Sequence, residues 1–239
     1  MRKILIFILI IFALFTLTGC VQKNKIPEGI KILKDDEIEC NVYSAMKIAY
    51  SLDEFILGSD ALLKFRVIEK SYITYQWTDT EYNYTSDIPA TVYTVKVLSD
   101  FGNRNIKPDT ELMIYTEHSP MTYWEDDINL RVNSEYIAFL GLLPDRMPEG
   151  LRSYVDYYIM DGELGIFPGI NENEYLVNNY TKQYMPFASQ PFKSGKETEQ
   201  EPKRYELYEI LPQNEMNWSI VGSVELVDFL TDRVSKVAR

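Results

Sequence analysis

The sequence predicts a mainly β fold, a small antiparallel barrel or sandwich with one helix before it and one amphipathic helix after it. Three observations lead to this prediction. Segments of β-branched and aromatic residues recur between residues 61 and 167, with polar turn residues between them. Apolar residues at three- and four-residue steps stand on either side of this block. With 46% hydrophobic and 25% charged residues, the chain of 239 residues can also bury a core of this kind.

The helix before the strands is expected at residues 41–57. Apolar residues recur there at three- and four-residue steps, which places them on one face of a helix. Asn41 is a suitable N-cap residue, and Gly58 is a suitable terminator. The predicted apolar face consists of Val42, Ala45, Met46, Ala49, Leu52 and Ile56.

The first strand is expected at residues 61–69, where apolar and charged side chains alternate. Its odd-numbered apolar residues share one face, and Lys64 and Arg66 share the other. The polar, tyrosine-rich stretch 78–87 is expected to form a long hairpin loop. Residues 91–98 are β-branched and aromatic and form the next strand.

Turn residues separate the remaining strands. We expect turns at Asp100, Gly102 and Asn103 and at Asn133-Ser134, with strands at 111–116, 135–140, 154–160 and 164–167. The pair Asp161-Gly162 is the strongest hairpin signal in the chain. It predicts that the segment 164–167 returns alongside 154–160.

The composition changes after residue 177. Residues 178–204 contain three prolines and a run of charged and small polar residues, so we expect a polar linker or loop. The segment 205–239 is expected to hold a strand at 205–211 and a final helix capped by Ser223. We expect this helix to dock on the barrel through one apolar face rather than bind a partner. The face consists of Val224, Val227, Leu230, Val234 and Val237.

The first twenty residues have the organisation of a secretory signal. Arg2 and Lys3 precede an uninterrupted apolar run at residues 4–15. About 20 apolar residues are needed to span a bilayer, so this run is too short for a comfortable span and fits a signal peptide. The signal ends in Leu17-Thr18-Gly19-Cys20.

That ending resembles the lipobox of bacterial lipoproteins. The resemblance implies that residues 1–19 are a lipoprotein signal peptide and that Cys20 carries a diacylglyceryl group on its sulfur. Residues 20–40 are then a lipidated tether, which holds the chain at the extracytoplasmic face of the cell membrane. An ordinary signal peptide that happens to end near a cysteine is the alternative.

The charge of the chain argues against one class of partner. The net charge is -12 and the isoelectric point is about 4.7. Binding to nucleic-acid phosphates needs clustered Lys and Arg, so no nucleic-acid partner is expected. Membrane contact is expected through the lipid on Cys20, because anionic headgroups repel so acidic a domain. Cys40 is then left alone; a reactive thiol and an intermolecular bridge are possible interpretations, and we adopt a buried residue without chemistry.

Four segments carry a second resemblance. They comprise a strand after Ser-Asp, a strand rich in Tyr and Val, a Tyr-x-x-Phe-Leu strand after a polar turn, and a closing segment with Gly. These segments are 59–67, 92–97, 133–140 and 162–167. The succession resembles the OB-fold-like bacterial domain related to tissue inhibitors of metalloproteinases. It implies that residues 41–177 form a small antiparallel OB-like barrel with its leading helix.

One departure limits what this resemblance implies. In the animal inhibitors, the free amine and carbonyl of an N-terminal cysteine chelate the protease zinc. Here Cys20 would be lipid-modified and precedes the first strand. The resemblance therefore implies the fold, and not inhibition by that mechanism.

No motif for catalysis or cofactor binding is present. The chain lacks GxGxxG, P-loop, HExxH and GxSxG patterns. His118 is the single histidine, and the adjacent Ser119 points to the other side of an extended segment, so no catalytic residue is expected. The acidic clusters 35–37 and 125–127 lack the alternating spacing of a calcium loop. We interpret them as solvated acidic faces and expect no metal and no cofactor, with calcium as the alternative.

Aromatic residues make up 13% of the chain and gather around two segments. Exposed aromatic rings suit sugar stacking or a protein hot spot, although they could equally cover the sheet. The candidate binding surface consists of Tyr72, Tyr75, Trp77, Tyr82, Tyr84, Tyr123 and Trp124. The sequence favours a non-enzymatic lipoprotein module that binds a protein or envelope component. A carboxylate-dependent envelope glycan hydrolase and a structural or stress lipoprotein without a dedicated ligand are the alternatives.

Overall fold

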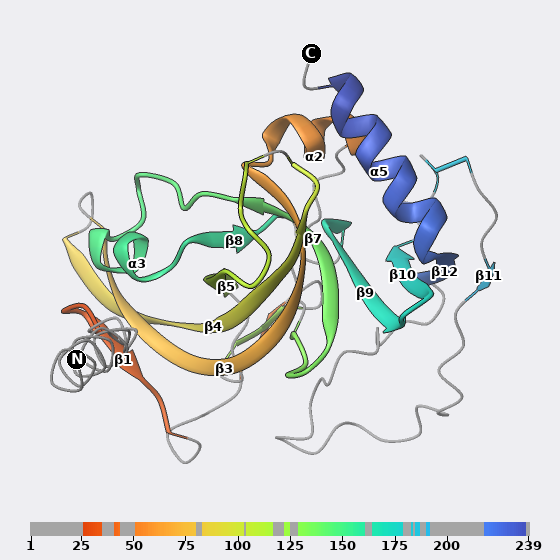
Figure 1. Ribbon diagram of the computed structural model, residues 1–239. Helices are drawn as coiled ribbons and strands as arrows, with labels where there is room; N and C mark the ends of the chain where they lie inside the picture. The colour runs from red at the N-terminus through yellow and green to blue at the C-terminus, as the bar shows by residue number, and fades with distance from the viewer. Residues whose placement is uncertain are drawn as a thin grey trace, which may run out of the picture.

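The computed structural model describes the greater part of the chain between residues 26 and 237 (Figure 1). The described residues are 26–34, 41–43, 51–79, 83–102, 104–116, 122–124, 129–160, 164–178, 183, 185–186, 190–191 and 218–237. The signal sequence, Cys20, Cys40, His118 and both acidic clusters lie outside them, as does the predicted strand at 205–211.

The described chain is mainly β. Its strands are β1 (Ile30–Ile32), β2 (Asn41–Tyr43), β3 (Ala61–Asp79), β4 (Tyr84–Asp100), β5 (Glu111–Thr116), β6 (Thr122–Trp124), β7 (Glu135–Gly141), β8 (Tyr157–Ile159), β9 (Ile166–Asn171), β10 (Glu174–Asn178), β11 (Gln190–Pro191) and β12 (Trp218–Gly222). Its helices are α2 (Leu52–Gly58), α3 (Glu149–Tyr154) and α5 (Ser223–Val237).

Strand pairing runs in a ring through β3, β4, β5, β8 and β7. The β3–β4, β4–β5, β7–β8 and β3–β7 pairs are antiparallel, whereas β5 and β8 run parallel. The sheet continues from β7 through β9, β10, β12 and β11, and β1 pairs with the outer part of β3. The long strands β3 and β4 curve strongly around the ring (Figure 1).

The predicted alternation in the first strand is confirmed. Leu63, Phe65 and Val67 of β3 are fully buried in one core cluster with residues of β4, β5 and β7. On the opposite face, the Arg66 guanidinium donates a hydrogen bond to the Glu135 carboxylate. The Lys64 ammonium lies 3.0 Å from the same carboxylate and forms an ion pair with it. Side-chain period two therefore separates an apolar face from a charged one.

A polar pair is buried inside this core. The Leu130 backbone N–H donates to the Tyr93 hydroxyl at 3.0 Å, and that hydroxyl donates to Asn129 Oδ1 at 3.3 Å. Burial raises the pKa of Tyr93, so its hydroxyl stays protonated and keeps both bonds at physiological pH.

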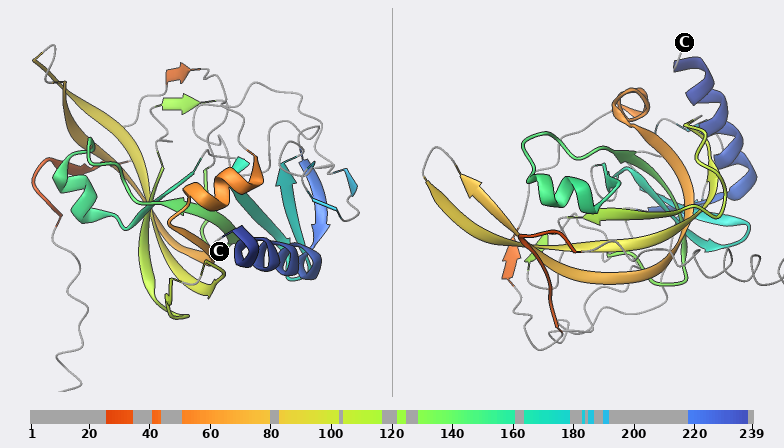
Figure 2. Two further views of the ribbon diagram at one scale, coloured as in Figure 1. Left: turned by 90° about the horizontal axis from the view of Figure 1, so that it is seen from above. Right: turned by 60° about the vertical axis from the view of Figure 1, so that its left-hand side comes forward.

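A second core cluster lies between the sheet and the helices α2 and α5 (Figures 1 and 2). Phe139 of β7 stacks on Phe55 of α2, with 5.6 Å between the ring centroids. The Arg233 guanidinium of α5 donates two hydrogen bonds of 2.6 Å to the Asp53 carboxylate of α2. Thus α5 packs on the sheet next to α2.

The buried face of α5 differs in part from the predicted stripe. Leu226, Leu230 and Val234 are buried, whereas Val224 is 70% exposed. The helix begins at Ser223, so Val224 lies in the first turn on the side away from the sheet. Within the expected linker 178–204, Met185 is buried in the second cluster, and β11 pairs with β12.

The predicted helix 41–57 is wrong in its first part. Residues 41–43 form strand β2, which pairs in parallel with β6. The helix α2 begins at Leu52 because Ser51 and Glu54 form a capping box. The Glu54 N–H donates to Ser51 Oγ at 3.3 Å, and the Ser51 N–H donates to Glu54 Oε2 at 2.6 Å. The predicted end at Gly58 is confirmed.

The predicted long loop at 78–87 is also wrong, because β3 and β4 continue as a hairpin until Asp79 pairs with Tyr84. Opposing threonines support this extension, since the Thr78 and Thr85 hydroxyls lie 3.0 Å apart. Asn83 adopts a φ of 49°, which asparagine tolerates in a tight turn. The hairpin projects beyond the ring, with β1 and α3 beside it (Figure 2).

Asp161 and Gly162 lie outside the described residues, and the flanking strands β8 and β9 do not pair with each other as the predicted hairpin requires. Both β8 and β9 pair antiparallel with β7, so they run in the same direction along one strand. Phe139 of β7 joins the two: its carbonyl accepts the Met160 N–H at 3.1 Å, and its N–H donates to the Gly165 carbonyl at 2.8 Å. The strands β8 and β9 therefore follow one another along the same edge of β7, so pairing with β7 takes the place of the predicted pairing between them.

Candidate binding site

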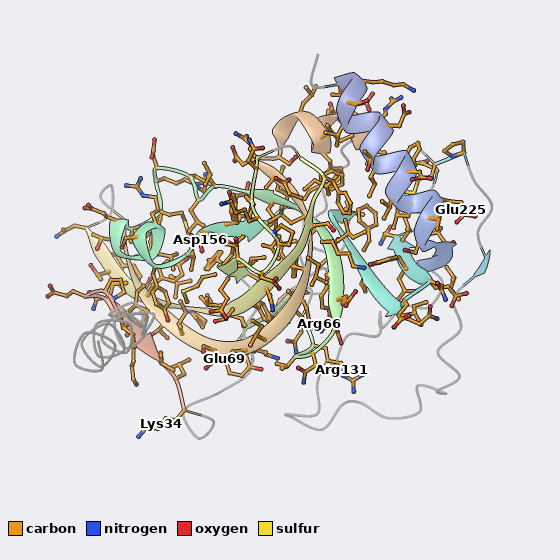
Figure 3. All side chains as sticks on the ribbon, viewed as in Figure 1. Lys34, Arg66, Glu69, Arg131, Asp156 and Glu225 are labelled. Atoms are coloured by element: carbon orange, nitrogen blue, oxygen red, sulfur yellow. The ribbon has the colours of Figure 1, made fainter. Side chains whose placement is uncertain are left out.

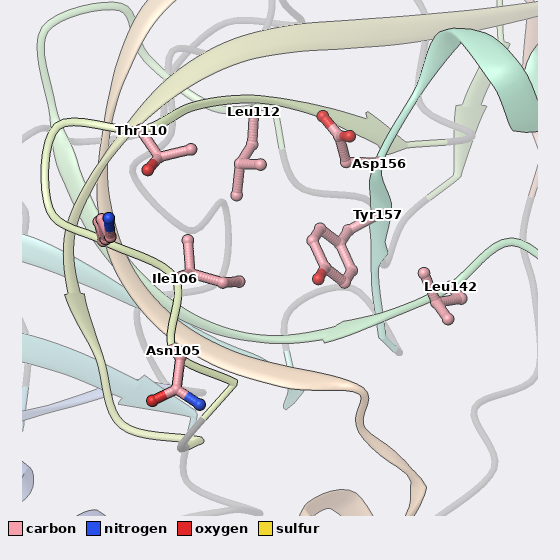
Figure 4. A pocket seen from close by; sticks show the side chains of 8 residues that line it. Asn105, Ile106, Thr110, Leu112, Leu142, Asp156 and Tyr157 are labelled. Carbon is pink, nitrogen blue, oxygen red and sulfur yellow. The ribbon is translucent and has the colours of Figure 1, made fainter.

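An open pocket of 440 Å³ lies where the β4–β5 connection meets the β7–β8 connection (Figure 4). This volume is within the range of small-ligand sites. The pocket is lined by Asn105, Ile106, Lys107, Thr110, Leu112, Leu142, Asp156 and Tyr157.

The first rim is the β4–β5 connection, which a single carboxylate holds in place. Asp100 accepts the Gly102 N–H at 2.9 Å and the Ile106 N–H at 3.1 Å. Asn105 has a φ of 59°, a left-handed conformation that asparagine tolerates. This rim is therefore shaped before any ligand arrives.

The second rim is the β7–β8 connection, which begins at Leu142 and ends at the start of β8, where Asp156 fixes it against β5. The Met113 N–H donates to Asp156 Oδ2 at 2.7 Å, and the Asp156 N–H donates to the Met113 carbonyl at 2.8 Å. The next residue, Tyr157, pairs in parallel with Ile114 of β5. The Tyr157 ring is thus presented to the pocket by a strand rather than by a loop (Figure 4).

Asp60 links the two rims. Its Oδ2 accepts the Leu142 N–H at 2.8 Å, and its Oδ1 lies 3.4 Å from the Arg104 guanidinium of the first rim. The Asp60 N–H itself donates to the Leu140 carbonyl at 2.8 Å, which ties this residue to β7. Three carboxylates, those of residues 60, 100 and 156, therefore organise the pocket.

The charges around the pocket affect the pKa of the Tyr157 hydroxyl. Burial is the largest cause that raises the pKa of Tyr157, followed by the negative charge of Asp156; Asp60 and Asp100 add to this, and Arg104 opposes it. The Tyr157 hydroxyl is therefore neutral at physiological pH and can both donate and accept a hydrogen bond.

The pocket combines polar groups that have no protein partner among the described residues with an apolar surface. The free groups are the Asn105 amide, the Lys107 ammonium, the Thr110 and Tyr157 hydroxyls, and Oδ1 of Asp156. Beside them lie three aliphatic side chains, of which Leu142 is 57% exposed. Such a lining binds a small amphipathic group by hydrogen bonds and apolar contact.

No protein-family model matches this chain. A comparison with curated proteins likewise finds no match, so neither comparison assigns a family. None of the helices in the described ranges has the length and apolar character to cross a membrane. Within the same ranges, no group of three or more His, Cys, Asp and Glu side chains is placed to hold a metal ion.

The predicted aromatic surface is not a single exposed patch. Tyr75 is 5% exposed, and its hydroxyl lies 3.2 Å from that of Tyr115, so its proposed place on a binding surface is wrong. It is buried because β1 and α3 pack on the extended hairpin and form a third core cluster there. Trp77 is half-buried against the same cluster.

The other predicted aromatic residues are scattered. Tyr72 is half-buried, with the Lys70 ammonium 5.0 Å from the centre of its ring, and Tyr84 is 63% exposed at the hairpin tip. Tyr82 lies outside the described residues, and so do the side chains of Tyr123 and Trp124.

None of the eight pocket residues was predicted from the sequence as a site residue. A cluster of turn-forming residues between two strands, with Lys107-Pro108-Asp109 at its centre, was the available signal for the first rim. Leu142 and Tyr157 carry no local signal, because only the pairing of β7 and β8 brings them to this rim.

Proposed function

We propose that this chain is a lipid-anchored bacterial lipoprotein of the extracytoplasmic membrane face, with an OB-like barrel that acts as a non-enzymatic binding module for an envelope component. The observation that carries the binding role is the organised pocket, in which Asp60, Asp100 and Asp156 hold two rims around polar groups that have no partner among the described residues.

The strand order supports the OB-like part of the proposal. An OB-fold is a five-stranded, partly open Greek-key barrel. The ring β3-β4-β5-β8-β7 has five members, a three-strand antiparallel meander at its start, and one parallel contact between β5 and β8. The lipobox at residues 17–20 supports the lipid anchor.

Binding fits the pocket better than glycan hydrolysis does. Glycosidases generally place two carboxyl groups on either side of the scissile bond. Among the described residues that line the pocket, Asp156 contributes the one carboxylate, and one of its oxygens already accepts the Met113 N–H.

The anchor is tested by growing the host with an alkyne-tagged fatty acid and measuring the label on the purified chain. We expect label on the wild type and on Cys40→Ser, and none on Cys20→Ser. The two cysteines make a matched pair, because each variant removes one thiol. Label that persists on Cys20→Ser would overturn the lipid anchor.

The pocket is tested with the full mature chain in detergent, used to retain components of the solubilised host envelope. Leu142→Asp places a charge in the pocket, whereas Val224→Asp places one on α5. Both wild-type side chains are exposed, at 57% and 70%, so neither variant disturbs a core. We expect Leu142→Asp alone to lose the retained component; identical retention by both variants would exclude the pocket.

A further inference from the structure

We infer that the pocket binds a neutral carbohydrate ring, so that the envelope component recognised is a neutral glycan. The inference rests on the proposed binding function and names the ligand class of the same site. Three properties of the lining lead to it: mixed hydrogen-bonding capacity, an apolar surface beside it, and an acidic surrounding.

The first property is the mixture of donors and acceptors. The Thr110 and Tyr157 hydroxyls each donate and accept, and the Asn105 amide does both through separate atoms. Neighbouring hydroxyl groups on a sugar ring also donate and accept, so they match such a set. A purely cationic or purely anionic ligand would leave part of it unpaired, which is costly at a binding site.

The second property is the apolar surface. Ile106, Leu112 and Leu142 lie around the same hollow as the Tyr157 ring (Figure 4). A pyranose presents C–H groups on its faces and hydroxyl groups at its edge. It can therefore cover the apolar side chains while its hydroxyls reach the polar ones.

The third property is the charge around the pocket. Three carboxylates, those of Asp60, Asp100 and Asp156, outnumber the two cations Arg104 and Lys107 around the pocket, and Arg104 lies 3.4 Å from Asp60. The basic side chains Arg66 and Arg131 lie well away from Asp156 (Figure 3). An acidic glycan would be repelled here, particularly by a chain of net charge -12.

The site is also pre-shaped for a weakly binding ligand. Both rims are held by carboxylate-to-backbone hydrogen bonds, so little conformational entropy is lost when a sugar enters. The strand β8 rather than a loop presents Tyr157, which keeps its ring in place.

The experiment uses the full mature chain in detergent on an array of neutral and acidic oligosaccharides, followed by calorimetric titration with any neutral glycan retained. Tyr157→Phe and Thr110→Val each remove one hydroxyl and keep the side-chain shape. Thr231→Val, at an exposed position of α5, is the matched control for Thr110→Val. We expect saturable binding of neutral members, weakened about three- to tenfold by each pocket variant and unchanged in the control.

Binding of acidic members alone, of no member, or of neutral members with equal affinity by all variants would overturn the inference. The failure of the proposed function is distinguishable from this. If Leu142→Asp loses an envelope component while no glycan binds, the binding module stands and the ligand is not a neutral glycan. If Leu142→Asp loses nothing and no glycan binds, both proposals fail.

Discussion

Removal of the Asp60 carboxylate should loosen the pocket and destabilise the fold by a measurable amount. In Asp60→Ala the Leu142 N–H loses its acceptor, and Arg104 loses an ion pair across the rims. The Asp60 side chain is 36% exposed, so water replaces part of both interactions. A net hydrogen bond contributes about 1 kcal/mol and an exposed ion pair up to about 1 kcal/mol, so we expect a loss of about 1–2 kcal/mol.

The assay is urea unfolding of the mature chain, together with hydrogen exchange of the Leu142 amide. In thermal unfolding, the same loss of stability should lower Tm by roughly 2–4 °C for each kcal/mol. Asp60→Asn separates the two contributions, because its amide oxygen still accepts the Leu142 N–H while the charge is lost. We expect this variant to lose at most about 1 kcal/mol.

Asp145→Ala is the matched control, since it removes a carboxylate that pairs with Arg152 at 2.9 Å on the exposed surface. It should change stability by less than about 0.5 kcal/mol and leave the Leu142 amide unaffected. Equal stability of Asp60→Ala and Asp145→Ala, with unchanged exchange at Leu142, would refute the role of Asp60 as the link between the rims.

Three further predictions concern the core and the charges. Tyr93→Phe removes the buried partner of the Leu130 N–H and should lower the free energy of unfolding by about 1–3 kcal/mol in urea titrations. Burial alone raises the pKa of Glu135, but hydrogen bonds and charges from its two basic partners outweigh this and lower it below 4.5. Its contribution to stability is therefore present above pH 4.5 and lost as the pH falls through the lowered pKa, so Glu135→Gln should flatten this part of a stability–pH profile. In the same unfolding assay, Leu226→Ala should lower the free energy of unfolding by about 2–5 kcal/mol and Val224→Ala by less than about 0.5 kcal/mol, because only Leu226 is buried. Equal losses would contradict the packing of the Leu226 face of α5 on the sheet.

Local pattern was enough to predict the strands that line the ring. In β3 the apolar residues of one face alternate with Lys64 and Arg66, and burial follows that alternation. The turn at Asn133 and the strand after it were also predicted from the sequence. Asn133 adopts a φ of 67°, a backbone conformation that few residue types accept, so its residue type indicates the turn. The sequence alone is informative where a single local requirement determines the residue type, such as the side-chain alternation of β3 or the positive φ of Asn133.

Competition between local and long-range pairing explains the failures. Asp161-Gly162 fits a tight turn, yet the free edge of β7 pairs with the chain on both sides of it. Tyr75 was predicted to lie on an exposed aromatic surface near a loop, but β1 and α3 cover it. The pocket was missed for the same reason, since its residues come from two separate connections and from the strands β5 and β8, which meet only through strand order.

The length of β3 separates two of its contacts. The strand begins at Ala61, beside Asp60 at the pocket, and pairs with β1 through Ile73, Thr74 and Tyr75. Because a strand advances about 3.3 Å per residue, the path from Ala61 to Ile73 is on the order of 40 Å before curvature shortens it. Other elements close this distance, since Val155, the neighbour of Asp156 in the pocket, shares the third core cluster with Ile30 of β1. A chain held by lipid at Cys20 would therefore enter the domain at a strand that packs on the same cluster as one rim of the pocket.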